Sequence, residues 1–161
     1  MIKIYIYRLY DEDKNVIYIG QTIREEVKKR LTEHFDIRSW NYNFFVGTSP
    51  AWIKKRKWIL DVKYYDYAEV EDSKEKLDQY EKFYISSLEP KGNINFINYP
   101  LSELDVKDDL TFTNLDDIEN ITKNNLVKEF REDFLYWEKV AIKKDKELEK
   151  RIKRNVYYLR D

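Results

Sequence analysis

The chain has 161 residues, of which 42% are hydrophobic and 16% aromatic, so it is long enough to bury a core within one domain. The net charge is only −1, so no overall basic field draws the protein to nucleic acid, and such binding needs a local patch. The lack of cysteine and the single histidine exclude disulfides, thiolate metal sites and multi-histidine zinc sites; a metal would be held by carboxylates, backbone and water, as Mg²⁺ is.

No apolar run of the sequence approaches the ~20 residues that a membrane-spanning helix needs. The N-terminus alternates polar and apolar residues, which is not the pattern of a signal peptide. We therefore expect a soluble, intracellular (cytoplasmic) protein with no membrane partner.

The first predicted elements are two strands, over residues 2–10 and 14–21. In both stretches polar and apolar residues alternate with a period of two. The acidic stretch 11–14 between them predicts a turn, and the three segments together predict an antiparallel hairpin.

Tyrosines gather on one face of this hairpin. If the turn is tight, Tyr7 lies directly opposite Tyr18, and Tyr5 lies opposite Gly20. Tyrosine is a good strand residue, so an aromatic pair in a half-buried sheet explains these residues without any function.

Downstream, the sequence predicts four helices and a third strand. Capping boxes begin at Thr22 and at Asp72, and Ser49 precedes a proline at the first position of a helix. In chain order we expect a helix from Thr22 to about Phe35, a loop over 36–49, a short helix over 51–58, a strand over 59–67, a helix over 73–88 and a helix over 126–158.

These elements predict a mixed fold of the α/β (α+β) class. It has a small three-stranded central sheet with an N-terminal antiparallel hairpin, flanked by helices, plus a long C-terminal helix. Residues 101–125 hold seven acidic residues and two lysines, which indicates a linker of poorly defined structure. We therefore predict a first domain over 1–98, an acidic linker over 99–125 and a helical extension over 126–161.

Two polar residues lie on the apolar stripe of the first predicted helix. At ~100° per residue, Arg30 and His34 fall on the same face as Val27 and Leu31. A buried charge without a partner costs ~3–5 kcal/mol, so Arg30 needs one. An arginine that reaches out from the edge of the stripe and a hydrogen-bonded core histidine would explain both residues equally well.

Glu81 is placed in the same way on the helix predicted over 73–88, among Leu77, Tyr84 and Leu88. A carboxylate in such surroundings needs a cation or a metal ion. An ion pair with Arg30 and a metal ligand are the two explanations. Together, such breaks in local patterning are typical of a functional site.

The ordered set of these residues resembles the GIY-YIG endonuclease family, which is named for two tripeptides on a hairpin. The second tripeptide is intact here, and the first has Tyr5 in place of glycine. In the predicted register the missing side chain of Gly20 would make room for Tyr5. The resemblance covers roughly residues 1–98, and its motifs are Tyr5-Ile6-Tyr7, Tyr18-Ile19-Gly20, Arg30 followed by His34, Glu81, and Pro90-Lys91-Gly92-Asn93.

The resemblance implies hydrolysis of DNA phosphodiester bonds. It implies Tyr7 as the general base, assisted by Tyr18. His34 is the rival base, because an imidazole needs no large pKa shift. It also implies Arg30 on the scissile phosphate and Glu81 as the ligand of one Mg²⁺ or Mn²⁺ ion per active site. Asn93 would orient the backbone or a phosphate oxygen, or it is an ordinary turn residue.

DNA is the expected partner, and the densest basic run of the chain offers a surface for it. The expected contacts are Gly20, Lys54, Lys55, Arg56 and Lys57. A solvated charged face explains the basic run equally well.

Two other functions stay open. The first is a catalytically inactive relative that binds DNA or a protein without cutting. The second makes residues 143–154 a dimerisation helix, which predicts a homodimer through the C-terminal helix and is compatible with a nuclease. The full set of chemical side chains at family-like spacings favours the nuclease.

Overall fold

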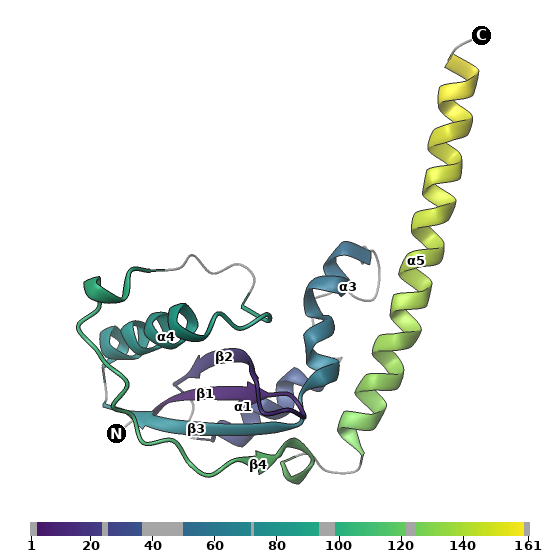
Figure 1. The fold of residues 1–161 in the computed structure, drawn as a ribbon. Helices are drawn as coiled ribbons and strands as arrows, with labels where there is room; N and C mark the ends of the chain where they lie inside the picture. Colours follow the sequence, from purple (N-terminus) through teal and green to yellow (C-terminus); the bar gives the residue numbers. More distant parts are fainter. Residues whose placement is uncertain are drawn as a thin grey trace.

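The structure is a computed structural model that describes residues 3–23, 26–36, 50–71, 73–93, 99–121 and 125–159. An antiparallel four-stranded sheet of order β2-β1-β3-β4 lies at its centre (Figure 1). The elements are β1 (Ile4–Tyr10), β2 (Val16–Thr22), α1 (Val27–His34), α3 (Pro50–Arg56), β3 (Tyr64–Val70), α4 (Lys74–Leu88), β4 (Asp116–Asp117) and α5 (Leu126–Leu159). The predicted mixed class is confirmed, with four strands where the sequence predicts three.

The register of the N-terminal hairpin differs from the predicted one by two residues. Tyr7 lies opposite Gly20 instead of Tyr18. The turn is not tight: the strands are joined by a five-residue loop, in which the Asp11 N–H donates to the Asn15 carbonyl at 3.0 Å. Because side chains alternate with a period of two, this shift leaves each side chain on its predicted face. Tyr7 and Tyr18 therefore remain neighbours, with ring centroids 6.2 Å apart.

Two predicted helix starts are wrong. Thr22 is the last residue of β2 and is buried, so it does not cap α1, which begins at Val27. The cap of α4 is Ser73, whose hydroxyl accepts the Lys76 N–H at 3.3 Å, one residue after the predicted Asp72. Asp72 itself lies outside the described residues. A serine hydroxyl makes the same hydrogen bond to a free helix N–H that an aspartate would make.

The third strand begins later than predicted. Residues 57–61 form a 3₁₀ helix that buries Trp58 and Ile59, so β3 starts at Tyr64. The apolar residues at the start of the predicted strand thus belong to a buried 3₁₀ helix and not to a strand. Residues 37–49, including the predicted cap Ser49, lie outside the described part of the chain.

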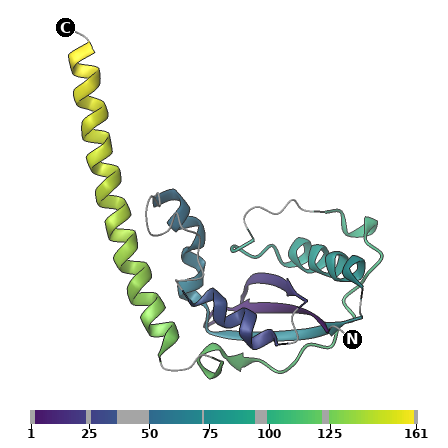
Figure 2. The same ribbon diagram turned by 180° about the vertical axis from the view of Figure 1, so that it is seen from behind.

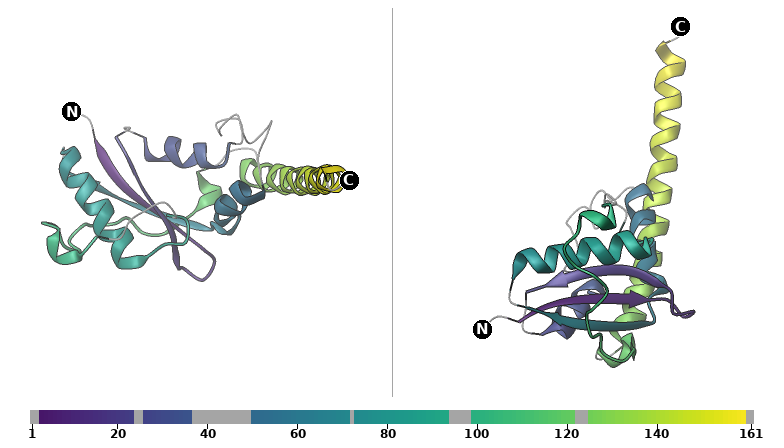
Figure 3. Two further views of the ribbon diagram at one scale, coloured as in Figure 1. Left: turned by 90° about the horizontal axis from the view of Figure 1, so that it is seen from above. Right: turned by 60° about the vertical axis from the view of Figure 1, so that its left-hand side comes forward.

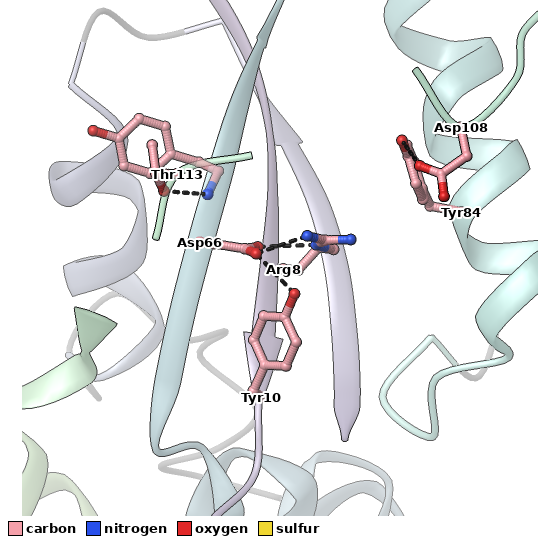
Figure 4. Close-up of polar contacts among 7 residues, drawn as sticks. Arg8, Tyr10, Asp66, Tyr84, Asp108 and Thr113 are labelled. Atoms are coloured by element: carbon pink, nitrogen blue, oxygen red, sulfur yellow. Dashed lines mark hydrogen bonds and ion pairs between the residues drawn. The ribbon is translucent and has the colours of Figure 1, made fainter. Parts of the chain in front are cut away.

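The sequence predicts poorly defined structure for the acidic segment 101–125. In the structure, the described residues of this segment lie against the sheet and α4 (Figure 4). The Tyr84 hydroxyl donates to the Asp108 carboxylate at 2.8 Å. The Thr113 N–H donates to the Tyr67 carbonyl at 2.9 Å, and β4 pairs with β3. Of the acids of this segment, Asp108 and Asp109 accept from tyrosines of α4 and Asp116 accepts from a tyrosine of β3, which composition alone does not reveal.

The helices α1 and α4 lie on opposite faces of the sheet (Figure 3), and each covers a hydrophobic cluster. The cluster under α4 contains Ile4, Ile6, Ile19, Val70, Leu77, Tyr84 and Ile85. The larger cluster on the α1 side contains Tyr5, Tyr7, Leu9, Leu31, Phe35, Ile59, Val62, Tyr65 and Ile118, among others. The strand β1 contributes to both clusters, which fixes it at the centre of the fold.

The long helix α5 begins in the core and then leaves it (Figures 1 and 2). Its first half buries Val127, Phe130, Phe134 and Ala141. Residues 142–155 are exposed throughout. The helix predicted over 126–158 is confirmed, while the division of the chain into domain, linker and extension stays a prediction. No helix in the described ranges is both long enough and apolar enough to span a membrane.

Candidate active site

Tyr7 occupies the centre of the candidate site and is fully buried. A Cβ atom added at Gly20 would collide with the ring carbons and the hydroxyl of Tyr7. The missing side chain of Gly20 therefore makes room for the phenol of Tyr7, and not for Tyr5 as the sequence predicts. Tyr5 lies opposite Thr22 and packs edge-on against Tyr67, with ring centroids 5.7 Å apart.

His34, in the last turn of α1, lies against the Tyr7 phenol. The Tyr7 Oη and the His34 Nε2 are 2.8 Å apart, a hydrogen bond between two elements far apart in the sequence. Burial, together with the positive charges of Arg30 and Arg56, lowers the pKa of His34 to about 3. His34 is therefore neutral at pH 7. The buried Val27 and Leu31 hold α1 against the cluster that contains Tyr7.

The proton of Tyr7 is firmly held. Burial raises the pKa of Tyr7 well above its ordinary value of 10.0, and the neighbouring Tyr18 raises it further. Arg30 lowers this pKa, whereas Glu81 raises it. The phenol thus lies within electrostatic reach of both the guanidinium and the carboxylate that the sequence predicts as its partners.

Tyr18 forms a second layer of the site. Its ring stacks on the indole of Trp58, with centroids 4.6 Å apart and planes inclined by 6°, and meets the His34 ring edge-on at 5.4 Å. Burial raises the pKa of Tyr18, and Arg30 lowers it. Trp58 was not among the predicted site residues; it comes from the 3₁₀ helix that replaces the start of the predicted strand, so its position had no signal in the sequence.

Arg30 of α1 is partly exposed. Its side chain is 38% exposed, and its guanidinium pairs with Glu33 of the same helix at 3.2 Å. Arg30 thus forms its ion pair with Glu33. The predicted alternative, an ion pair between Arg30 and Glu81, is not found among the described residues. Arg30 remains beside both phenols, since its charge acts on the pKa of Tyr7 and of Tyr18.

Glu81 enters from α4, on the other side of β2. Burial raises the pKa of Glu81, and the negative charge of Asp78 raises it further, while a hydrogen bond from Gln21 and the charge of Lys74 lower it. Asp78 and Gln21 are two site neighbours that the sequence reasoning missed. Asp78 was detectable, because a residue three positions before Glu81 shares its helix face.

Asn93 acts on the protein backbone. Its Oδ1 accepts the Ile19 N–H at 3.0 Å, and its Nδ2 donates to the Ile19 carbonyl at 2.9 Å. The strand β2 lies at the edge of the sheet, so these backbone groups would otherwise have no partner in it. The neighbouring Gly92 is needed for this approach, because a Cβ there would lie 2.6 Å from the Ile17 carbonyl and 2.8 Å from the Trp58 ring.

The predicted basic run divides between the site and α5. All four residues are exposed, and the charge of Arg56 acts on the pKa of His34 and of Tyr18. Lys57 pairs with Glu138 of α5 at 3.0 Å. Lys54 and Lys55 lie on α3 without reaching the site. Of the run, Arg56 is the residue whose charge acts on Tyr18 and His34.

The comparison with known families agrees with this geometry. The family model for the GIY-YIG catalytic domain matches residues 3–95 of the chain. Comparisons with curated proteins and with solved structures give no match. The matched range contains every predicted catalytic residue from Tyr7 to Asn93. Because the match covers more than half of the chain, this protein belongs to the GIY-YIG family of nucleases.

Proposed function

We propose that this protein is a metal-dependent endonuclease that hydrolyses DNA phosphodiester bonds, using one Mg²⁺ or Mn²⁺ ion per active site. The observation that carries the proposal is the convergence on the Tyr7 phenol. A histidine is hydrogen-bonded to it, and the charges of Arg30 and Glu81 both act on it from opposite sides of β2. A phosphodiesterase needs a base, a cation for the phosphate and a ligand for a metal ion at one point.

Tyr7 takes the proton of the attacking water in this proposal, and His34 takes the proton of Tyr7. The free protein is not ready for this transfer, because burial raises the pKa of Tyr7 and lowers that of His34 to about 3. Raising the pKa of His34 by about 4 units requires about 5 kcal/mol. One phosphate charge ~4 Å away contributes ~4 kcal/mol at an effective dielectric constant of ~20. A bound phosphate would therefore supply most of what protonation of His34 requires, while Arg30, which lowers the pKa of Tyr7, and the metal ion would offset the rise that the same charge causes at Tyr7.

Arg30 binds the scissile phosphate. Its present partner is Glu33, in a pair whose side chains are 38% and 28% exposed. Such exposed pairs contribute only ~0–1 kcal/mol, so a phosphate can replace Glu33 at little cost. A guanidinium donates two parallel hydrogen bonds to a phosphate, which orients the phosphorus toward the water held by Tyr7.

Glu81 would hold the metal ion. Its carboxylate is partly buried beside the negative charge of Asp78, an arrangement that a divalent cation would relieve. Within the described residues no group of three or more side chains could form a metal cage. One or two carboxylates with water and substrate phosphate completing the sphere is the usual arrangement for Mg²⁺. When bound, the ion would act as a Lewis acid and stabilise the leaving 3′ oxygen.

DNA would reach the site along α3. Arg56 extends the cationic surface from Arg30, and the exposed Lys54 and Lys55 continue it. Lys57 adds less, because its ammonium group is engaged by Glu138. Gly20 stays a predicted DNA contact, which only its backbone can make because glycine has no side chain.

Nicking and cleavage of plasmid and branched DNA, with Mg²⁺ and with a chelator, test the proposal. We expect the wild-type protein to cut only with the metal, and Glu81→Ala to lose cutting. Cleavage by Glu81→Ala at the wild-type rate would contradict the proposed metal ligand. A wild-type protein that retards DNA on a gel without cutting it would replace the nuclease by the inactive DNA-binding module.

A further inference from the structure

The residue directly after the second tripeptide, Gln21, joins the site from the side opposite to Tyr7. Gly20 faces the Tyr7 ring, and the next side chain along β2 points to the other face of the sheet, toward α4. Gln21 is thus the residue of β2 that reaches the helix carrying Glu81.

Both ends of the Gln21 amide are held. Its Nε2 donates to the Asp78 Oδ1 at 2.9 Å, and its Oε1 accepts from the Lys74 Nζ at 2.7 Å. Lys74 and Asp78 also pair with each other at 3.1 Å, across one turn of α4. Gln21 also lowers the pKa of Glu81, which lies three positions after Asp78 on the same helix. Gln21 therefore connects two residues of α4, Lys74 and Asp78, to the edge of the sheet.

The ion pair of Lys74 and Asp78 is too exposed to fix this arrangement alone. Their side chains are 62% and 42% exposed, and an exposed pair at this spacing contributes only ~0.3–0.5 kcal/mol. Gln21 is less exposed than Lys74 and belongs to a strand of the sheet, so it provides the fixed point. Side chains that orient a metal ligand typically change metal affinity about 10- to 100-fold when they are replaced.

We propose that Gln21 is a positioning residue of the metal site: together with Lys74, its amide keeps the Asp78 carboxylate engaged, so that Glu81 on the same helix is the carboxylate left for the cation. This inference rests on the proposed function, since it takes Glu81 as the metal ligand. It assigns a role to the position after the tripeptide that the catalytic proposal leaves without one.

Binding of Mn²⁺ to the full chain without DNA tests the inference, with free Mn²⁺ measured by electron paramagnetic resonance. We expect Gln21→Leu to weaken the affinity at least tenfold. Gln21→Asn keeps an amide but is one methylene shorter, so it should lose affinity in the same way, and it carries the test if Gln21→Leu does not fold. Gln79→Leu is the matched control, because Gln79 lies on the same helix but bonds the Asp105 N–H.

The reference variant is Glu81→Gln, which should lose Mn²⁺ binding. If Glu81→Gln loses binding while folded Gln21→Leu and Gln21→Asn bind as tightly as wild type, the role of Gln21 is refuted and the metal ligand stands. If Glu81→Gln binds Mn²⁺ like the wild type, the metal site itself is wrong and the inference falls with it. A loss in Gln79→Leu equal to that in Gln21→Leu would also overturn it, because the effect would then be a general one of the helix.

Discussion

Tyr7 can occupy its position only because residue 20 has no side chain. The phenol lies over Gly20, so the glycine of the second tripeptide serves the tyrosine of the first. The glycine that the family has in the first tripeptide is Tyr5 here, and its ring packs into the core against Tyr67. The departure from the family pattern is therefore absorbed by core packing, one pleat away from the phenol.

A methyl group at position 20 tests this dependence. We expect Gly20→Ala to be destabilised by about 1–3 kcal/mol, because the added Cβ overlaps the Tyr7 ring and overpacks the core. DNA cleavage should fall as well, since the phenol must move. Urea unfolding and the cleavage rate are the measurements. Wild-type stability together with wild-type cleavage would show that the ring does not lie over residue 20.

His34 makes the stability of the protein depend on pH in a defined window. Its pKa is about 3 in the folded chain against 6.5 for an ordinary histidine, so between these values the unfolded chain binds more protons. Stability therefore falls as the pH is lowered from about 6.5 toward 3. The loss from this residue between pH 7 and pH 5 is about 2 kcal/mol at most.

Carboxylates also destabilise proteins at low pH, so the effect is measured as a difference. Urea unfolding of the wild type and of His34→Gln at pH 7 and pH 5 isolates it, because glutamine has no proton to bind. We expect the wild type to lose more stability than His34→Gln over this interval. Equal losses would mean that His34 is not held in its neutral form.

At the scale of elements, the acidic segment packs against a buried ion pair of the sheet. Arg8 of β1 and Asp66 of β3 form two hydrogen bonds, at 2.9 and 2.7 Å, and the Tyr10 hydroxyl adds a third to Asp66 at 2.8 Å (Figure 4). The ring of Phe112, from the acidic segment, lies 3.4 Å from the guanidinium carbon of Arg8. The pair thus joins two strands and gives the segment a place to pack.

Removing the acid of this pair leaves a charge without a partner. The side chains of Arg8 and Asp66 are only 18% and 5% exposed, so we expect Asp66→Ala to cost about 3–5 kcal/mol in the free energy of unfolding. Asp61→Ala is the matched control, because its pair with Lys91 is exposed on both sides and its loss should change stability by less than about 0.5 kcal/mol. Similar values for the two variants in urea unfolding would contradict the account.

Hydrophobic periodicity predicted the helices and strands that bury one regular face of apolar side chains. The strands of the hairpin, α4 and α5 all follow from it, and so does the placement of Arg30 and His34 on the stripe of α1. The hairpin register did not, because it depends on the length of the turn. The place of the acidic segment depends on partners such as Tyr84, far away in the sequence, which no local pattern contains.

The candidate site was predictable in its chemical groups but not in their surroundings. The resemblance supplied Tyr7 and Glu81, which the fold brings within electrostatic reach of each other. The stacking of Trp58 on Tyr18 and the bonds of Gln21 arise from tertiary packing, and neither residue breaks a local pattern. Sequence reasoning finds residues that look misplaced, and it misses those whose local environment looks ordinary.

At the scale of the whole molecule, the net charge of −1 hides an uneven distribution. The exposed basic run on α3 leads toward the site through Arg56, whereas Lys57 turns to Glu138 on α5. The half of α5 beyond residue 141 projects into solvent and exposes Leu148 and Ile152. The homodimer through this helix stays a prediction. Light scattering checks it, by comparing the mass in solution with the chain mass of 19.9 kDa.

The salt dependence of DNA binding distinguishes the contribution of Arg56 from that of Lys57. We expect Arg56→Gln to weaken binding and to lower the slope of log affinity against log salt by about 1, as for the loss of one phosphate contact. Lys57→Gln should leave the slope unchanged, because its ammonium group is engaged by Glu138. An unchanged slope in Arg56→Gln would place the DNA elsewhere.

Single-turnover DNA cleavage by Tyr7→Phe, at saturating Mg²⁺ and with DNA binding measured in parallel, tests whether the Tyr7 phenol carries the proton. We expect a fall of about 10²- to 10⁴-fold in the cleavage rate with binding retained, since one hydroxyl that carries the proton is removed. Tyr5→Phe, on the same strand and face, should cut at the wild-type rate. Cleavage by Tyr7→Phe as fast as by Tyr5→Phe would contradict the role of the Tyr7 phenol.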